Sequence, residues 1–299
     1  MIAPASAEAD SPGVDDRAPA AGLGTTTVSP PLALPLPLAP RWRPEWVRFD
    51  LPHAILSGTS GAAALGLRLF VAAPRPGWKD EVLFDRAFAQ ALRADDAQTR
   101  ATLSEASDVL QLGFLLYPFL VDAALVASVI HDDPDLGFQL GLISMESLLV
   151  SSLTISATKS FVGRVRPDGE PCPGTTDDYG CRSETTRSSF VSGHTTLAFA
   201  SAGTICATHV HLDLYGGGWG DIAACAGAVG LATTTGLLRV AAGKHYGTDV
   251  VAGALLGFAT GYFVPTLLHF TSWAPVRSDF GVVPTLPTSG PGLALIGWF

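Results

Sequence analysis

Six apolar stretches of about 20 residues each dominate the chain from residue 54 onward, and a helix needs roughly that length to cross a bilayer. Several of them are rich in Ala, Gly, Ser and Thr, which suits close helix packing inside a membrane. Short polar turns separate them, which disfavours the alternative of a large soluble helical core. We therefore predict an all-α fold, a six-helix transmembrane bundle. The predicted spans are Ala54–Ala73, Val109–Ile130, Leu136–Phe161, Thr195–Leu212, Ile222–Ala241 and Thr248–Phe270.

The segments that flank these stretches differ from them in composition. Residues 1–45 are rich in Pro and Ala and lack the basic start and unbroken apolar core of a signal peptide, so we predict a disordered leader. Residues 78–110 mix charged and apolar side chains at helical spacing, which predicts a surface amphipathic helical segment. Residues 273–299 place β-favouring side chains on both sides of a Pro- and Gly-rich turn, which favours a C-terminal β-hairpin. The membrane-embedded domain is accordingly predicted at 46–272.

The charge balance bears on the partner. The chain carries 18 Lys and Arg against 27 Asp and Glu, whereas proteins that hold nucleic acid by its phosphates cluster an excess of Lys and Arg. A composition that is 47% hydrophobic and only 15% charged is unusual for a soluble protein. We expect the bilayer as partner and no nucleic acid, and the sequence predicts no oligomeric state.

The four cysteines fall in two contexts. Cys172 and Cys181 flank the polar loop "CPGTTDDYGC"; they form a disulfide if that loop faces an oxidising compartment and are otherwise free thiols. Cys206 and Cys225 lie inside apolar stretches and are predicted to be small core residues.

Three charged residues interrupt the apolar stretches: Arg68, Asp122 and Glu146. An ionised group inside a membrane is costly unless it is paired or meets water, so one interpretation is a polar pathway. The interpretation that we favour has Arg68 extending to the membrane interface and Glu146 protonated or bonded to a nearby Ser or Thr.

The first of three polar clusters at span ends is "KSFVGRVRP". Lys159 and Arg166 are seven residues apart, so two helical turns would bring them to one face. A Lys point charge beside a forked guanidinium suits a doubly charged oxyanion such as phosphate. Pro167 discourages further helix, and Arg164 is expected on another part of the helix, in solvent.

The second cluster is "SFVSGHTT", which leads into the fourth stretch. If Ser192 caps that helix, the free N–H groups of its first turn face a bound anion. Gly193 has no Cβ to obstruct the approach of an oxyanion to the backbone. His194 then lies beside the anion, where it can deliver a proton.

The third cluster, "RVAAGKHYGTDV", links the last two stretches. His245 and Asp249 are four residues apart, which lets the carboxylate orient the imidazole and leaves the other ring nitrogen free to act as a nucleophile. Arg239 completes the cations around the anion, whereas Lys244 receives no role.

The order and spacing of these clusters, Lys-x6-Arg-Pro, then Ser-Gly-His, then Arg-x5-His-x3-Asp, resemble the three-part signature of the type 2 phosphatidic acid phosphatase superfamily, which includes bacterial acid phosphatases and vanadium haloperoxidases. The resemblance covers 159–249 in motifs and about 54–270 through the apolar pattern. Val191 stands where the family often has Pro, and Leu238 where it often has Ser. Neither replaces a group that does chemistry, although the lost Ser hydroxyl removes one hydrogen bond to phosphate.

The resemblance implies a metal-independent phosphomonoesterase or pyrophosphatase that hydrolyses a lipid phosphate through a phosphohistidine, without a cofactor. By it His245 attacks phosphorus, Asp249 orients His245, and His194 protonates the leaving alkoxide and later activates water. The residues that it implies for binding the phosphoryl oxygens are Lys159, Arg166, Ser192, Gly193 and Arg239. The sequence shows no dense Asp/His cluster of the two-metal type.

Two alternatives remain open: a vanadium-dependent haloperoxidase of the same fold, and a non-catalytic membrane protein that binds or transports an anion. Alternation of the six spans places the three clusters on one face of the membrane. The resemblance implies a bacterial inner membrane with this face in the periplasm.

Overall fold

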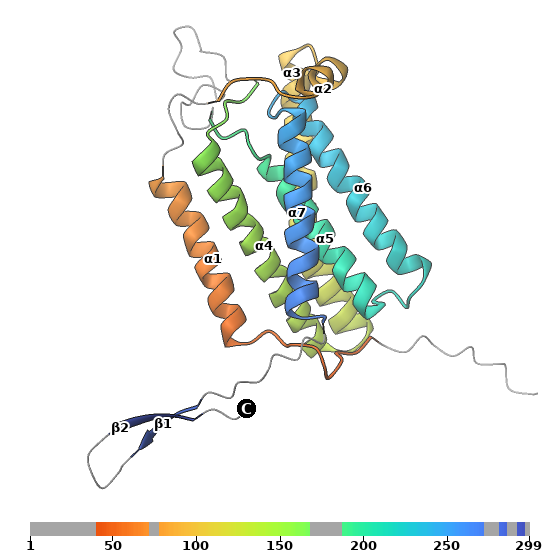
Figure 1. The fold of residues 1–299 in the computed structure, drawn as a ribbon. Coiled ribbons are helices and arrows are strands. Elements are labelled where there is room, and N and C mark those ends of the chain that lie inside the picture. Colours follow the sequence, from red (N-terminus) through yellow and green to blue (C-terminus); the bar gives the residue numbers. More distant parts are fainter. Residues whose placement is uncertain (1–39, 72–77, 168–186, 272–280, 286–291, 297–299) are drawn as a thin grey trace, which may run out of the picture. The chain divides into compact units, whose positions relative to one another are not determined.

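The structure is a computed structural model that describes residues 40–71, 78–167, 187–271, 281–285 and 292–296. Within them it contains seven α-helices, one π-helical segment and two strands (Figure 1). The helices are α1 (Leu51–Phe70), α2 (Asp85–Leu92), α3 (Ala97–Tyr117) with its π-helical continuation η1 (Pro118–Ile130), α4 (Pro134–Val162), α5 (Gly193–Leu212), α6 (Trp219–Ala241) and α7 (Gly247–Leu268). Strands β1 (Gly281–Thr285) and β2 (Gly292–Ile296) pair antiparallel, in the tail where the sequence favours a hairpin.

Among the described residues, four helical segments are long and apolar enough to cross a membrane: α3 with η1, α4, α6 and α7. The chain is therefore an all-α integral membrane protein in the part that these helices form, and four of the six predicted spans are confirmed as candidates. The predicted amphipathic segment is α2 followed by the first half of α3, which runs on into the second span without a break.

The two predicted spans that are absent from this set are α1 and α5. Helix α5 packs against α3, α4, α6 and α7 and is buried over most of its length. Because its Ala, Ser, Thr and Gly side chains contact protein rather than lipid, packing and not hydropathy determines its place in the bundle.

Helices α5 and α7 approach each other until their backbones touch. A Cβ added at Gly257 would lie 2.1 Å from the carbonyl oxygen of Thr196, and one at Gly261 would lie 2.0 Å from that of Ala200. Only glycine permits this approach, so the four-residue glycine spacing on α7 fixes the register of the two helices. That register joins their N-terminal ends, where the amide of Ser192 donates to the carbonyl oxygen of Asp249 (3.1 Å).

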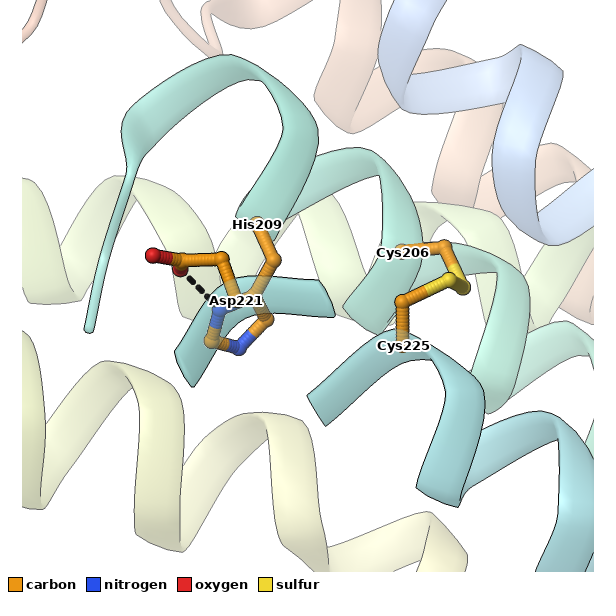
Figure 2. Close-up of a disulfide and its surroundings, with 4 residues drawn as sticks. All are labelled: Cys206, His209, Asp221 and Cys225. Atoms are coloured by element: carbon orange, nitrogen blue, oxygen red, sulfur yellow. Dashed lines mark hydrogen bonds and ion pairs between the residues drawn. A yellow bond between two sulfur atoms is a disulfide. The ribbon is translucent and has the colours of Figure 1, made fainter. Parts of the chain in front are cut away.

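The prediction for Cys206 and Cys225 needs correction. Cys206 is buried as expected and Cys225 is half-buried, but they form a disulfide that connects α5 to α6 (Figure 2). The short turn between these antiparallel helices brings the two Cα atoms within 4.5 Å, a proximity that the sequence separation of 19 does not reveal. One helical turn away, Nδ1 of His209 lies 2.5 Å from Oδ1 of Asp221, again between α5 and α6. The proposed pairing of Cys172 with Cys181 lies outside the described residues.

The acidic residues inside the apolar stretches have histidine partners. Asp122 lies 3.5 Å from Nε2 of His209. Glu146 is fully buried and contacts His53 (3.0 Å) and His269 (2.7 Å). The favoured interpretation, a Glu146 that is protonated or bonded to a nearby Ser or Thr, did not include these partners, because both histidines lie outside α4 and far away in sequence.

Candidate active site

A cavity of about 680 Å³ lies where the C-terminal ends of α1 and α4 meet the N-terminal end of α5. The same end of the bundle carries α2 and the start of α3 (Figure 1). Five predicted site residues line the cavity: Lys159, Arg166, Gly193, His194 and His245. The other three, Ser192, Arg239 and Asp249, are buried and contact its lining or the residues that hold it.

Lys159 and Arg166 meet in the cavity, but not through the predicted geometry. Helix α4 ends at Val162, where Gly163 adopts a left-handed conformation (φ 62°). Arg166 is therefore not on a helix, and the expectation of stacking over two turns was wrong. Instead both side chains converge on Ser188: Nζ of Lys159 donates to its carbonyl oxygen, and Nη2 of Arg166 donates to its Oγ (3.3 Å).

The start of α5 faces the cavity through Gly193 rather than through Ser192. Ser192 occupies the N-cap position but makes no side-chain capping bond, and its Oγ instead accepts a hydrogen bond from Thr195 (2.8 Å). Ser192 is therefore the N-cap residue that the sequence analysis considered, but without a bond from its side chain to the first turn. A Cβ on Gly193 would lie 3.7 Å from Cε of Lys159, so the glycine keeps open the space between the helix N-terminus and that cation.

His194 and Arg239 are connected by Asp108 of α3. Nε2 of His194 lies 2.7 Å from Oδ1 of Asp108, and Nη1 of Arg239 donates to the same oxygen (3.2 Å). Arg239 also donates to the hydroxyls of Ser107 (3.0 Å) and Ser104 (3.1 Å). The surface-facing carboxylate thus orients two of the predicted site residues, a role that the sequence analysis did not assign to Asp108.

His245 and Asp249 lie close together at the start of α7. Nδ1 of His245 is 3.6 Å from Oδ2 of Asp249, slightly beyond hydrogen-bond distance. The carboxylate is held in place because Oδ2 accepts from the hydroxyl of Ser189 (2.5 Å) and the amide of Tyr246 (2.9 Å). Asp249 is thus fixed beside the imidazole of His245 without a hydrogen bond to it.

Arg164 is the principal site residue that the sequence analysis missed. It is fully buried, not in solvent, and its two Nη atoms donate to Asp249 and to Asp85, both at 2.6 Å. Its guanidinium lies over the rings of Trp78 (4.2 Å) and Tyr246 (4.0 Å). The available signal was Gly163, because a helix that ends at a left-handed glycine sends the next residues in a new direction.

The pKa values of Asp85 and His245 are both lowered, but for different reasons. Burial alone would raise the pKa of Asp85, but hydrogen bonds from the amide of Val82, from Arg164 and from Thr248 outweigh it and lower the pKa. Burial lowers the pKa of His245 well below 6.5, and the cations Arg166 and Lys159 act in the same direction against Asp249. The Asp85 carboxylate is therefore ionised and the His245 imidazole is neutral near neutral pH.

The fold and the site are those of a helical membrane protein with a cationic, histidine-containing cavity at one end of its bundle. Residues 140–273 match the sequence model of the PAP2 superfamily, which confirms the resemblance drawn from the three motifs. The chain is also 33% identical, over 119 residues, to a lipid A 1-phosphatase of Porphyromonas gingivalis. That match covers 38% of this chain and only 21% of the relative.

Among solved structures, the chain is similar to a transmembrane PAP2-type phosphatidylglycerolphosphate phosphatase from Bacillus subtilis. The identity is 20% and the TM-score 0.43, with 72% of this chain and 91% of the other covered.

Proposed function

We propose that the chain is a phosphatase that hydrolyses a lipid phosphate, by a metal-independent route through a phosphohistidine. The observation that carries the proposal is one cavity that holds both the cations for a phosphoryl group, Lys159 and Arg166, and two histidines, His194 and His245. Phosphoryl transfer requires positioning and stabilisation of charge on three oxygens, which such cations and the N–H groups at the start of α5 supply.

In the proposed reaction a ring nitrogen of His245 attacks phosphorus, and the bond from phosphorus to the ester oxygen breaks. His194 gives its proton to the departing alkoxide. It then takes a proton from water, whose oxygen attacks the phosphohistidine, releasing inorganic phosphate and free His245. Asp249 orients His245, while Ser192, Gly193 and Arg239 complete the phosphate site.

A lipid suits the rest of the cavity. The cavity is lined by the cations and also by apolar residues at the end of α1, Leu69, Phe70 and Val71. The charged head group of a lipid can therefore contact the cations while its apolar chain contacts these side chains. Arg68 also lines the cavity, and we assign that side chain to the head group rather than to membrane anchoring. The name of the Porphyromonas gingivalis relative supports a lipid phosphate as substrate.

For the membrane arrangement we propose that α1 and α5 also cross the bilayer, which gives six spans within the domain 46–272, between the leader 1–45 and the tail 273–299. The proposed site is a bacterial inner membrane with the cavity on the periplasmic side. A thiol reagent that cannot cross the membrane tests this in reduced intact cells: it must label Cys172 and Cys181, and failure to do so would reverse the orientation.

The activity is tested by measuring phosphate release by the purified full chain from phosphatidic acid, phosphatidylglycerol phosphate, undecaprenyl diphosphate and lipid A. We expect release that persists after chelation and is inhibited by vanadate, because vanadate mimics the trigonal phosphoryl group. Loss on chelation with recovery on added metal would contradict the metal-independent route. Bromination that depends on vanadate would instead indicate a haloperoxidase, and anion binding without turnover a transport or binding protein.

The low pKa of His245 predicts the acid side of the pH profile. A neutral nucleophile is lost only as pH falls through its pKa, so kcat/KM should persist below pH 6.5. Replacing Arg166 with Gln removes a cation that disfavours the imidazolium, so the pKa of His245 rises and the acid limb moves to higher pH. The pH profiles of kcat/KM for wild type and Arg166→Gln are measured with the same substrate, and each is scaled to its own maximum. If the two acid limbs coincide, the assignment of the acid limb to His245 is contradicted.

A further inference from the structure

A second cluster of ligand-type side chains lies away from the phosphate cavity. His53 in the first turn of α1, Glu146 in the middle of α4 and His269 just after α7 place their donor atoms within 4.8 Å of one another. Glu146 precedes Lys159 by thirteen residues on α4, which corresponds to about 20 Å along the helix axis. The proposed phosphatase chemistry therefore uses none of these three side chains.

The cluster is built to present nitrogen lone pairs to a cation. Nδ1 of His269 lies 2.9 Å from the carbonyl oxygen of Val47, which can only accept, so Nδ1 carries the proton. The remaining nitrogen, Nε2, then has a lone pair directed at Oε2 of Glu146, 2.7 Å away. Two lone pairs in this arrangement repel each other unless a proton or a metal ion lies between them.

His53 contacts the other carboxylate oxygen. Its Nδ1 lies 3.0 Å from Oε1 of Glu146, while its Nε2 lies 3.9 Å from Oδ1 of Asp50, beyond hydrogen-bond distance. Both imidazoles thus place one nitrogen against Glu146. His269 also makes the outer contact that histidine ligands of metals almost always show, which fixes the tautomer and the ring orientation.

We propose that His53, Glu146 and His269 bind a divalent transition metal of the zinc class. Two imidazoles and one carboxylate form a donor set that Zn²⁺ accepts, with a fourth position for water. Ligands about 2.1 Å from a tetrahedral zinc lie about 3.4 Å apart, so the two N–O distances would open by roughly half an ångström. The fully buried carboxylate gains a compensating charge, since Glu146 and two neutral imidazoles alone would leave a net negative charge.

The metal would join segments that no helix connects directly. Val47 precedes α1 and already pairs with His269, its amide donating to the carbonyl oxygen of that residue (3.1 Å). A bound ion would fasten this segment and α1 to α4 and to the end of α7. Its role is thus structural, and its loss lowers the melting temperature rather than altering the phosphate site directly.

The test uses the full chain without a polyhistidine tag, stripped with chelator and titrated with Co²⁺ in detergent. We expect one Co²⁺ per chain, visible absorption bands of a low-coordinate nitrogen-ligated ion, their loss on adding Zn²⁺, and a higher melting temperature with either metal. Glu146→Gln and His269→Ala should weaken Co²⁺ binding about tenfold or more, the effect known even for outer-contact residues. His131→Ala is the matched control, a histidine bonded to the carbonyl oxygen of Leu214 and remote from the cluster in its contacts, and should bind normally.

Wild-type protein that shows no Co²⁺ bands and no metal-dependent change in melting temperature would overturn the proposal and leave a proton-bridged His–Glu–His cluster. Equal binding by wild type and Glu146→Gln would also overturn it. These measurements need no substrate, so they stand apart from the proposed phosphatase activity. Glu146→Gln also distinguishes this metal site from the phosphatase activity in assays. This variant lacks a metal ligand of the cluster, so if chelation inactivated it, the chelator would have to act on a metal elsewhere, at the phosphate cavity.

Discussion

Replacing His245 with Ala is expected to reduce phosphate release from lipid phosphates by about 10⁴-fold or more, because the proposed covalent route loses its attacking group. The imidazole lines the cavity and its pKa lies well below 6.5, so at neutral pH it is neutral and able to attack phosphorus. His245→Gln retains hydrogen-bonding capacity in the buried space and should be equally inactive. A melting temperature close to that of wild type for either variant separates lost chemistry from lost folding.

The matched control is the neighbouring cation. Lys244→Ala changes a charge next to His245 in sequence, but Lys244 does not line the cavity, so its activity should stay within about threefold of wild type. Phosphate release by His245→Ala within tenfold of wild type, from folded protein, would contradict the nucleophile assignment. Equal release by wild type, His245→Ala and His194→Ala would remove the enzyme hypothesis altogether.

His194 can be distinguished from His245 by the leaving group. General acid catalysis contributes about 10²- to 10⁴-fold when the departing oxygen needs a proton. With p-nitrophenyl phosphate the leaving phenolate is stable without one, so His194→Ala should lose much less activity on this substrate than on a lipid phosphate. His245→Ala should be equally defective on both, since each needs the nucleophile.

The parts of the site that the sequence predicted are those encoded by local order. Lys159, His194 and His245 each lie at the end of an apolar stretch, and alternation of helices brings such ends together. The position of Arg166 does not follow from helical spacing, because Gly163 ends α4 before that residue. Periodicity is informative only inside an element, and Arg166 lies four residues beyond the last residue of α4.

The parts that escaped prediction depend on contacts between distant segments. Asp85 and Asp108 come from the stretch that was interpreted as a surface amphipathic segment, yet they orient Arg164 and His194. Charge in such a segment is normally solvated, and only tertiary packing shows that Asp85 is buried and that the exposed Asp108 contacts the site. The disulfide between Cys206 and Cys225 escaped for the same reason, since two apolar helices give no sequence signal of where they touch.

Replacing Arg164 with Ala is expected to destabilise the fold by about 3–5 kcal/mol, because it removes the cation from a fully buried cluster and leaves two carboxylates uncompensated. Asp249 would lose the bond to its Oδ1 and with it a fixed position beside His245, so phosphate release should also fall. Arg164→Lys keeps the charge but cannot bond both carboxylates and lie flat between two rings, so it should be intermediate. Thermal unfolding in detergent measures the first effect, and initial rates well below the melting temperature measure the second.

The matched control is Arg86→Ala, which removes an α2 arginine from an exposed ion pair with Glu81 (3.1 Å), just before that helix, and should cost less than about 1 kcal/mol. A double variant tests the electrostatic cause. Adding Asp85→Asn to Arg164→Ala removes one of the two carboxylate charges left without Arg164, so it should recover part of the lost stability. Asp85→Asn alone should destabilise wild type. Unfolding of Arg164→Ala at the same temperature as Arg86→Ala would contradict the predicted stabilisation by the buried cluster, and an unchanged initial rate would show that Arg164 is not what holds Asp249. A double variant that is less stable than Arg164→Ala would show that packing, and not unpaired charge, dominates the loss.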